Sequence, residues 1–215
     1  MVANMASHPA GRTASGRMSG PERREQLLDV ARGIVTGNGF SAISMEAVAR
    51  SAGVTRPVVY EHFDRLDNLL EALVDRETGR ALAQLTATRP QRTPGGDPRE
   101  DLLASLRAYL EAVEAEPLTW RLVLLPPDGA PQRLREFIAA GRSWNLERLA
   151  ELVSTGVTTG SESPDPELTA RLLSAVAEDS ARLLLTNPAE FPVERLLAHA
   201  RWALALLGTP GGSPR

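Results

Sequence analysis

The chain has 215 residues, of which 42% are hydrophobic and 24% charged, and its formal net charge is −3. These values fit a globular protein that can bury its own core. Because the chain contains no cysteine, disulfides, thiolate metal sites and cysteine nucleophiles are excluded. No apolar run approaches the roughly 20 residues of a membrane-spanning helix, so we expect a cytoplasmic protein without a membrane partner.

The charge is distributed unevenly along the chain. Residues 1–60 contain seven arginines and four acidic residues, a net charge of +3, whereas the remainder carries −6. A basic segment joined to an acidic one is typical of a DNA-binding domain fused to a domain that does not bind DNA. An excess of a few charges also arises by chance.

Apolar residues recur with helical spacing almost throughout, and strand-like alternation never persists. We therefore expect an all-α fold of nine helices, three in a small head and six in a larger body. The expected organisation is a disordered arm at 1–20, a helix-turn-helix head at 21–66, a ligand-binding and dimerisation body at 67–207 and a disordered tail at 208–215.

In the head, the first helix is expected from about Pro21 to Thr36, because proline suits a first turn and glycines follow Thr36. The second begins after the cap Ser44, and the third runs from Thr55 to about Phe63.

In the body, the fourth helix starts near Asp67, and its expected apolar stripe is Leu69, Leu70, Leu73, Val74 and Leu82. Segments rich in proline and glycine at 88–98 and 156–166 are expected to be loops. The remaining helices are expected at Arg99–Ala115, Pro117–Leu125, Pro131–Ser154, Glu167–Leu185 and Pro192–Leu207.

The segment Ser44–Phe63, SMEAVARSAGVTRPVVYEHF, places two short helices on either side of Ala-Gly-Val. Small residues at this turn permit the close crossing of a helix-turn-helix, whose second helix enters the major groove of DNA. The same geometry also packs many all-α proteins, so spacing favours DNA binding without deciding it.

The expected DNA contacts fall into two sets. Arg56 can donate two hydrogen bonds to guanine, and Pro57 and Val58 can touch thymine methyl groups. Contacts to the phosphate backbone are expected from Arg24, Ser44, Thr55, Tyr60 and His62.

Residues 24–70 resemble the N-terminal domain of the TetR family of bacterial regulators, a likeness that covers about a fifth of the chain. The matching motifs are Gly39-Phe40, Ala52-Gly53-Val54-Thr55, Tyr60-Glu61-His62-Phe63 and Leu69-Leu70. The family often has lysine three residues after that phenylalanine, where it meets a phosphate. Here the position is Leu66, and the adjacent Arg65 is a candidate substitute.

The resemblance implies a sequence-specific transcriptional regulator that binds a palindromic operator in double-stranded DNA as a homodimer. A small-molecule effector would release it. Most members repress transcription, so we predict a repressor, with an activator or a ligand-independent helical adaptor as alternatives. The family dimerises through its last two helices, and the candidate interface residues are Leu168, Leu172, Val176, Leu183, Leu184, Leu196, Leu197, Ala200, Leu204 and Leu207.

The resemblance places the effector pocket inside the body, where apolar walls and a few polar groups are expected. The candidates are Trp120, Arg121, Leu124, Trp144, Asn145, Glu178 and Arg182. Core packing explains the two tryptophans equally well, and an ion network explains Glu178 with Arg182.

An enzyme is not expected, because His8, His62 and His199 are isolated and no glycine-rich loop follows a strand. No cofactor or metal is expected either.

Overall fold

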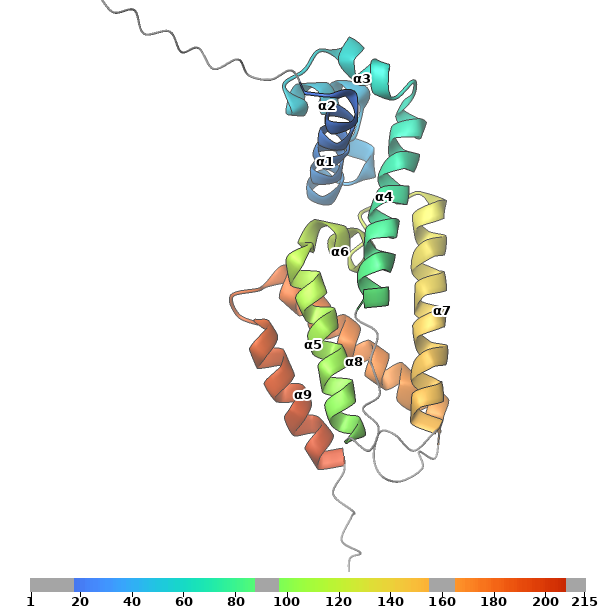
Figure 1. The fold of residues 1–215 in the computed structure, drawn as a ribbon, viewed down its shortest axis with the longest axis vertical. Helices are drawn as coiled ribbons and strands as arrows, with labels where there is room; N and C mark the ends of the chain where they lie inside the picture. Colours follow the sequence, from blue (N-terminus) through green and yellow to red (C-terminus); the bar gives the residue numbers. More distant parts are fainter. Residues whose placement is uncertain (1–17, 88–96, 155–164, 208–215) are drawn as a thin grey trace, which may run out of the picture.

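The computed structural model describes residues 18–87, 97–154 and 165–207, and within these ranges the chain is all-α, as expected. The predicted helix bounds agree with the observed ones to within two residues. In chain order, as Figure 1 shows, the elements are α1 (Gly20–Asn38), the 3₁₀ helix η1 (Phe40–Ala42), α2 (Met45–Ala52), α3 (Arg56–His62), α4 (Leu66–Ala87), α5 (Pro98–Ala115), α6 (Pro117–Leu124), α7 (Gln132–Ser154), α8 (Pro166–Thr186) and α9 (Val193–Leu207).

The start of α1 differs from the prediction, which placed Ser19 and Gly20 in a disordered arm. The Ser19 hydroxyl accepts a hydrogen bond from the Glu22 backbone N–H at 3.4 Å, and the Glu22 carboxylate accepts one from the Ser19 backbone N–H at 2.8 Å. This reciprocal capping box satisfies two backbone donors and begins the helix earlier. Residues 1–17 of the expected arm, residues 88–96 and 156–164 of the two expected loops and the expected tail at 208–215 lie outside the described residues. The loops were expected to extend to Pro98 and Pro166, where α5 and α8 already begin.

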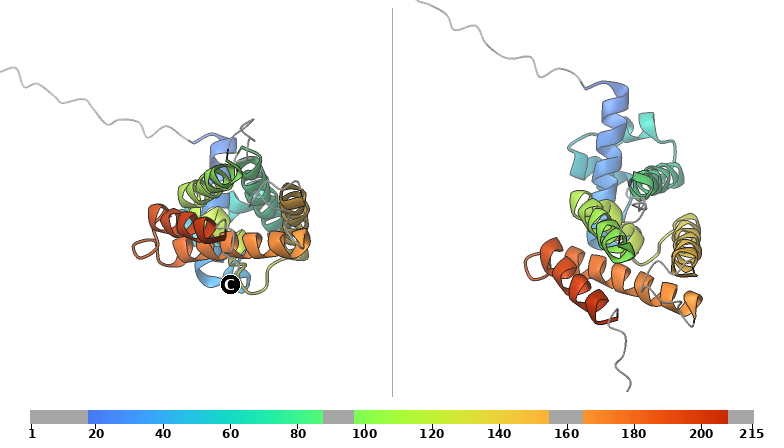
Figure 2. Two further views of the ribbon diagram at one scale, coloured as in Figure 1. Left: turned by 90° about the horizontal axis from the view of Figure 1, so that it is seen from below. Right: turned by 60° about the horizontal axis from the view of Figure 1, so that its bottom comes forward.

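The helices form an elongated molecule with the head at one end. Helices α1, α2 and α3 form the head, and α4 runs from the head into the body beside α7 (Figure 1). At the other end α8 crosses under α5 and packs against α7, with α9 beside α5 (Figure 2). Within the described ranges no helix combines the length and apolar character needed to cross a membrane.

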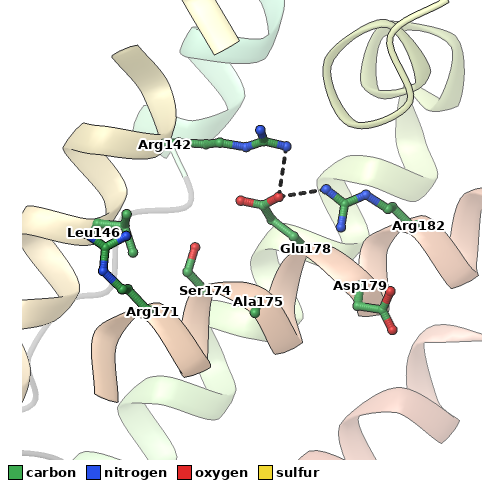
Figure 3. A pocket seen from close by; sticks show the side chains of 8 residues that line it. All are labelled: Arg142, Leu146, Arg171, Ser174, Ala175, Glu178, Asp179 and Arg182. Atoms are coloured by element: carbon green, nitrogen blue, oxygen red, sulfur yellow. Dashed lines mark hydrogen bonds and ion pairs between the residues drawn. The ribbon is translucent and has the colours of Figure 1, made fainter. Parts of the chain in front are cut away.

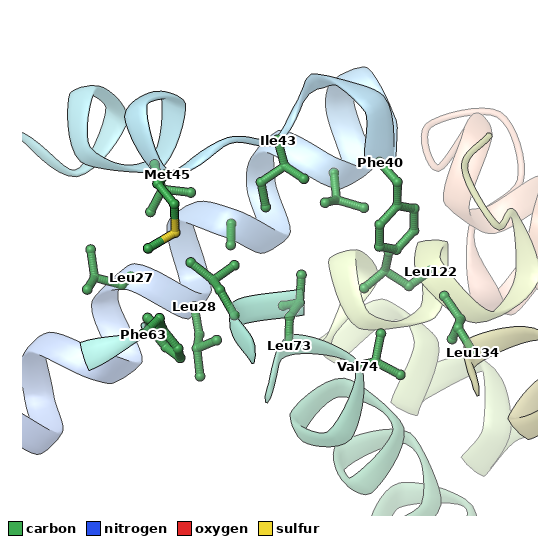
Figure 4. Close-up of a cluster of buried hydrophobic side chains, with 14 of the residues drawn as sticks. Leu27, Leu28, Phe40, Ile43, Met45, Phe63, Leu73, Val74, Leu122 and Leu134 are labelled. Atoms are coloured by element: carbon green, nitrogen blue, oxygen red, sulfur yellow. The ribbon is translucent and has the colours of Figure 1, made fainter. Parts of the chain in front are cut away.

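One hydrophobic cluster crosses the boundary between head and body. It contains buried residues of α1, η1, α2, α3 and α4, among them Leu28 and Phe63. It continues into the body through Leu122 of α6 and Leu134 of α7, which Figure 4 shows next to Val74 and Phe40. Because close-packed side chains fill this boundary, the head cannot turn relative to the body without repacking them.

Helix α6 joins this cluster to a second one. Leu122 belongs to the first, whereas Trp120 and Leu124 are buried in a second cluster with residues of α5, α8 and α9. Val123 packs against both clusters. Helix α6 is mostly apolar, and Thr119, Trp120, Leu122 and Leu124 are buried, as expected of a short helix that lies between others.

The carboxylate of Glu77 on α4 is 1% exposed and lies where α1, α4 and α6 meet. The Thr119 hydroxyl of α6 donates a hydrogen bond to its Oε2 at 2.5 Å, and Arg32 Nη1 of α1 lies 3.4 Å from the same oxygen. Arg76 Nη2 lies 2.8 Å from Oε1. The two arginines also pair with acidic residues nearer the surface, which are Glu25, Asp29 and Glu116.

Leu82 was expected on the buried stripe of α4, and this was wrong, because its side chain is 56% exposed. Leu69, Leu73 and Ala81 are fully buried and recur at multiples of four residues. Leu82 lies on the opposite side of the helix, and the position that continues the stripe after Leu73 is the charged residue Glu77.

We predict that Glu77→Gln lowers the free energy of unfolding by about 3 kcal/mol, because it leaves Arg32 and Arg76 without their buried counter-charge. Urea denaturation at a fixed protein concentration measures this loss. Glu71→Gln, the same substitution at an exposed position of α4, should change stability by less than about 0.5 kcal/mol. Equal losses in the two variants would show that the buried cluster is not stabilising.

Candidate functional site

The turn between α2 and α3 has the geometry of a helix-turn-helix. The Ser44 hydroxyl caps α2 by accepting from the Ala47 N–H at 3.0 Å. Gly53 ends the helix in the left-handed region, with φ 66° and ψ 32°, and the Val54 N–H donates to the Ala49 carbonyl at 3.0 Å. A residue without Cβ is favoured at this conformation, which redirects the chain into α3.

One face of α3 packs into the core of the head, and the opposite face is exposed. Val59 and Phe63 are fully or almost fully buried in the head, whereas Arg56, Pro57 and Tyr60 are exposed. The exposed residues present a guanidinium, an apolar ring and a phenol in one row. A short helix with a free outer face and hydrogen-bond donors on it matches the recognition helix of a helix-turn-helix.

Acidic neighbours limit the charge of this surface. Arg56 Nη1 lies 3.8 Å from Glu46 Oε2, and Arg50 Nη1 lies 4.0 Å from Glu46 Oε1, with all three side chains exposed. Arg65 pairs with Asp67 at 3.1 Å. These exposed pairs are weak, so a phosphate or a base can replace the carboxylate as the partner of any of the three arginines.

The other predicted DNA contacts lie around the same end of the head. Ser44, Thr55 and Arg24 are exposed, and the Arg24 guanidinium lies 4.9 Å from the centre of the Phe63 ring. The side chain of Thr55 makes no capping hydrogen bond to α3. Val58 and His62 are partly buried. The structure thus brings the predicted residues together on one end of the molecule.

A pocket of about 480 Å³ lies between α7 and α8, away from the head. Figure 3 shows Arg142 and Arg182 converging on the Glu178 carboxylate. Glu178 Oε2 lies 3.2 Å from Arg142 Nη2 and 2.8 Å from Arg182 Nη2. The other lining residues are Leu146, Arg171, Ser174, Ala175 and Asp179.

Behind this pocket, aromatic side chains close the body core. The Tyr109 ring meets Trp120 edge to face, with centroids 5.3 Å apart, and Trp120 Nε1 donates to Gln84 Oε1 at 2.8 Å. Burial, with the charge of Glu178 adding to it, raises the pKa of the Tyr109 phenol. Tyr109 therefore remains a neutral hydroxyl at physiological pH.

Known proteins share both the helix-turn-helix motif and the all-α fold of this chain. The family model for bacterial regulatory proteins of the TetR family matches residues 27–73. The transcriptional activator FasR of Mycolicibacterium smegmatis is 27% identical over 180 residues, which cover 83% of this chain and 80% of FasR. A TetR-like regulator from Rhodococcus sp. RHA1 superposes with a TM-score of 0.69 at 26% identity, covering 91% of this chain and 100% of that one. Residues 27–73 thus match the TetR-family domain, and the chain as a whole is similar to TetR-family regulators in sequence and fold.

AibR, solved in complex with isovaleryl coenzyme A and operator DNA, shows the same fold at a TM-score of 0.64. It is 20% identical and covers 88% of this chain and 100% of AibR. The role comes from the sequence matches: the family model over residues 27–73 and the likeness to FasR support a DNA-binding transcriptional regulator with an N-terminal helix-turn-helix.

The predicted ligand-binding residues do not form one group. Glu178 and Arg182 line the pocket, and Asn145 lies next to it, because its Nδ2 donates to Ser174 Oγ at 3.1 Å. Trp144 is exposed on α7 and lines a separate shallow hollow. Three candidates are engaged elsewhere: Trp120 and Leu124 in the core, and Arg121 with the Leu185 carbonyl at 2.5 Å.

Sequence reasoning missed Arg142, Ser174 and Glu77. Arg142 and Ser174 give no local signal, because they reach the pocket only when α7 packs on α8. Glu77 did give a local signal in the sequence, since it interrupts the apolar stripe of α4 between Leu73 and Ala81. A charged residue at a core position indicates a buried partner on another helix.

We predict opposite effects for two Gly→Ala substitutions at positions where an added Cβ meets nothing within 4 Å. Gly53→Ala should destabilise the chain by about 1 kcal/mol, because φ is +66° there. Gly79→Ala, within α4, should stabilise it by about 0.5–1 kcal/mol. Thermal and urea denaturation measure both, and a Gly53→Ala variant as stable as the parent would contradict the left-handed turn.

Proposed function

We propose that the chain is a homodimeric repressor that binds an inverted-repeat operator and is released by a small-molecule effector bound in its body. The observation that carries the proposal is the outer face of α3. Its exposed residues Arg56, Pro57 and Tyr60 lie beside the exposed Ser44 and Thr55 at the free end of the molecule. We assign base contacts to Arg56, Pro57 and Val58 and backbone contacts to the remaining predicted residues, Arg24, Ser44, Thr55, Tyr60 and His62.

Exposed apolar residues on α8 support the dimer. Leu168, Leu172 and Val176 follow one another at intervals of four, so they form one stripe, and Trp202 of α9 is also exposed. A stripe of large apolar side chains open to water indicates a protein interface. Leu184 and Leu197, which were also predicted for the interface, are buried in the body core, and the Leu207 side chain lies outside the described residues.

The shared core supports effector-dependent release. An effector that binds the body more tightly in one arrangement of α4, α6 and α7 changes the packing against the head, because these helices supply part of the same cluster. Linkage then requires bound DNA to weaken effector binding by the same factor as the effector weakens DNA binding.

Activation is the second candidate, because the similar protein from Mycolicibacterium smegmatis is an activator. Repression requires only that the protein occupy DNA that the polymerase needs. Activation also requires a surface that recruits the polymerase. Transcription in vitro from a template carrying the selected operator distinguishes the two, since added protein should lower the transcript level of a repressed promoter and raise that of an activated one.

We predict that selection from random duplex DNA with the purified chain enriches an inverted repeat with half-sites about one helical turn apart. On that DNA, Arg56→Ala should lose about 1–3 kcal/mol of discrimination at one base pair. Tyr60→Phe should weaken binding to all sequences alike, because a phosphate contact is lost. Fluorescence anisotropy at fixed salt measures both effects.

Arg107→Ala on α5 is the control for this experiment, because it removes the same charge far from α3. It should leave the affinity for the selected DNA unchanged. If Arg56→Ala and Tyr60→Phe both bind like the parent, α3 does not read the DNA and the proposed interface is wrong.

We predict that Leu172→Glu converts a dimer into a monomer, because it places a charge in the centre of the α8 stripe. Light scattering coupled to gel filtration should show a fall from twice 23.1 kDa to 23.1 kDa. Leu82→Glu is a matched control, since Leu82 is 56% and Leu172 61% exposed, but Leu82 lies on α4. A Leu172→Glu variant that stays dimeric would exclude α8 as the interface.

A further inference from the structure

The pocket between α7 and α8 contains more positive than negative charge where its side chains converge. Arg142 and Arg182 both contact the same oxygen of Glu178, at 3.2 and 2.8 Å, so one carboxylate serves two guanidinium groups. Arg142 has no second ion pair among the described residues. One positive charge at the convergence point is therefore left without a counter-charge.

The other polar groups of the pocket do not supply that counter-charge. Arg171 is engaged with Glu167 of its own helix, at 2.8 Å. Asp179 points away from Arg142 and Glu178, as Figure 3 shows. Ser174, which is buried, accepts a hydrogen bond from Asn145 through its hydroxyl oxygen, so its own proton can still be donated. Beside Arg142, where Asp179 does not reach, the unused hydrogen-bonding capacity therefore consists of donors.

From this arrangement we propose that the pocket binds a small organic carboxylate. Its carboxylate would lie against Arg142 and the Ser174 hydroxyl, and its apolar part would lie against Leu146 and Ala175. Bidentate pairing of a guanidinium with a carboxylate is among the strongest charged hydrogen-bonding arrangements. A volume of about 480 Å³ is in the range of small-molecule sites. This inference rests on the proposed function, because it names the chemical class of its effector.

Amines and neutral molecules fit the pocket less well. An amine would have to take Glu178 from two guanidinium groups, and these would then lose the one counter-ion they share among the described residues. A neutral amide can accept hydrogen bonds from Arg142 but leaves the excess charge in place. A carboxylate satisfies both the donors and the charge.

The pocket is connected to the head through α6. Besides contacting Glu178, Arg182 donates through Nε to the Leu124 carbonyl at the end of α6, at 3.2 Å. Thr119, on the same short helix, bonds Glu77 at the junction with the head. A carboxylate that draws Arg142 away from Glu178 leaves Glu178 paired with Arg182 alone, and Arg182 is bonded directly to α6.

Isothermal titration of the full chain with matched probes tests the chemical class. The probes are benzoate, benzamide and benzylamine, and hexanoate, hexanamide and hexylamine. At least one carboxylate should bind while its amide and amine do not. Arg142→Gln should weaken carboxylate binding tenfold or more, and Glu178→Gln should strengthen it severalfold, because a competing anion is removed. Arg133→Gln, which removes the same charge from the surface of α7, should leave it unchanged.

Three results would overturn the inference. They are preferred binding of an amine, no carboxylate binding with a Kd below about 1 mM, or loss of the dimer in Arg142→Gln by light scattering, which would make the hollow part of the interface between copies. Folding of each variant is checked by its thermal transition. Binding of the selected operator is measured in parallel, so a chain that binds DNA but no carboxylate refutes only this inference, whereas a chain without operator binding refutes the proposed function itself.

Discussion

The attachment of the head to the body depends on one buried carboxylate. Glu77 of α4 is reached by Arg32 from α1 and by the Thr119 hydroxyl from α6, so a single side chain connects three helices. Burying a charge is costly unless it is paired and hydrogen-bonded. Arg32 Nε is buried without a hydrogen-bond partner, and Arg76 Nη2 forms ion pairs, at 2.8 Å with Glu77 Oε1, but no hydrogen bond. Small displacements of α4 or α6 therefore alter the contacts of a charge that is costly to leave unpaired.

The apolar packing around this cluster explains how α6, a helix of eight residues, joins the core of the head to the core of the body. Leu122 extends the core of the head, whereas Trp120 and Leu124 belong to the core of the body. Two arginine contacts with backbone carbonyls also bind α6 to α8, one from Arg182 to Leu124 and one from Arg121 to Leu185. A shift of α8 is thus transmitted to α6 by direct bonds. Such a contiguous network is the physical form that coupling between two distant sites can take.

Features that depend on residues close together in the sequence could be predicted, whereas features that depend on residues far apart in the sequence could not. The head was predictable, because Ser44, Gly53 and Val59 act through caps, a left-handed turn and a stripe that lie within twenty residues of one another. The all-α architecture and the helix bounds follow from the same local rules. The pocket was not predictable, since Arg142 and Glu178 are joined only by the packing of α7 on α8. Helical spacing does not reveal whether a leucine of α8 is buried, like Leu184, or exposed, like Leu172.

The geometry of α8 places the proposed interface and the proposed effector site on neighbouring faces of one helix. Leu172 and Val176 are exposed on its outer face, and Ala175 and Asp179, which alternate with them, line the pocket. The opposite face, with Ala181 and its neighbours, is buried in the body core. A rigid helix cannot move on one face alone. In the proposed dimer, a rearrangement around Glu178 that moved α8 would therefore also change the angle at which two copies meet, and with it the separation of the two α3 helices on DNA.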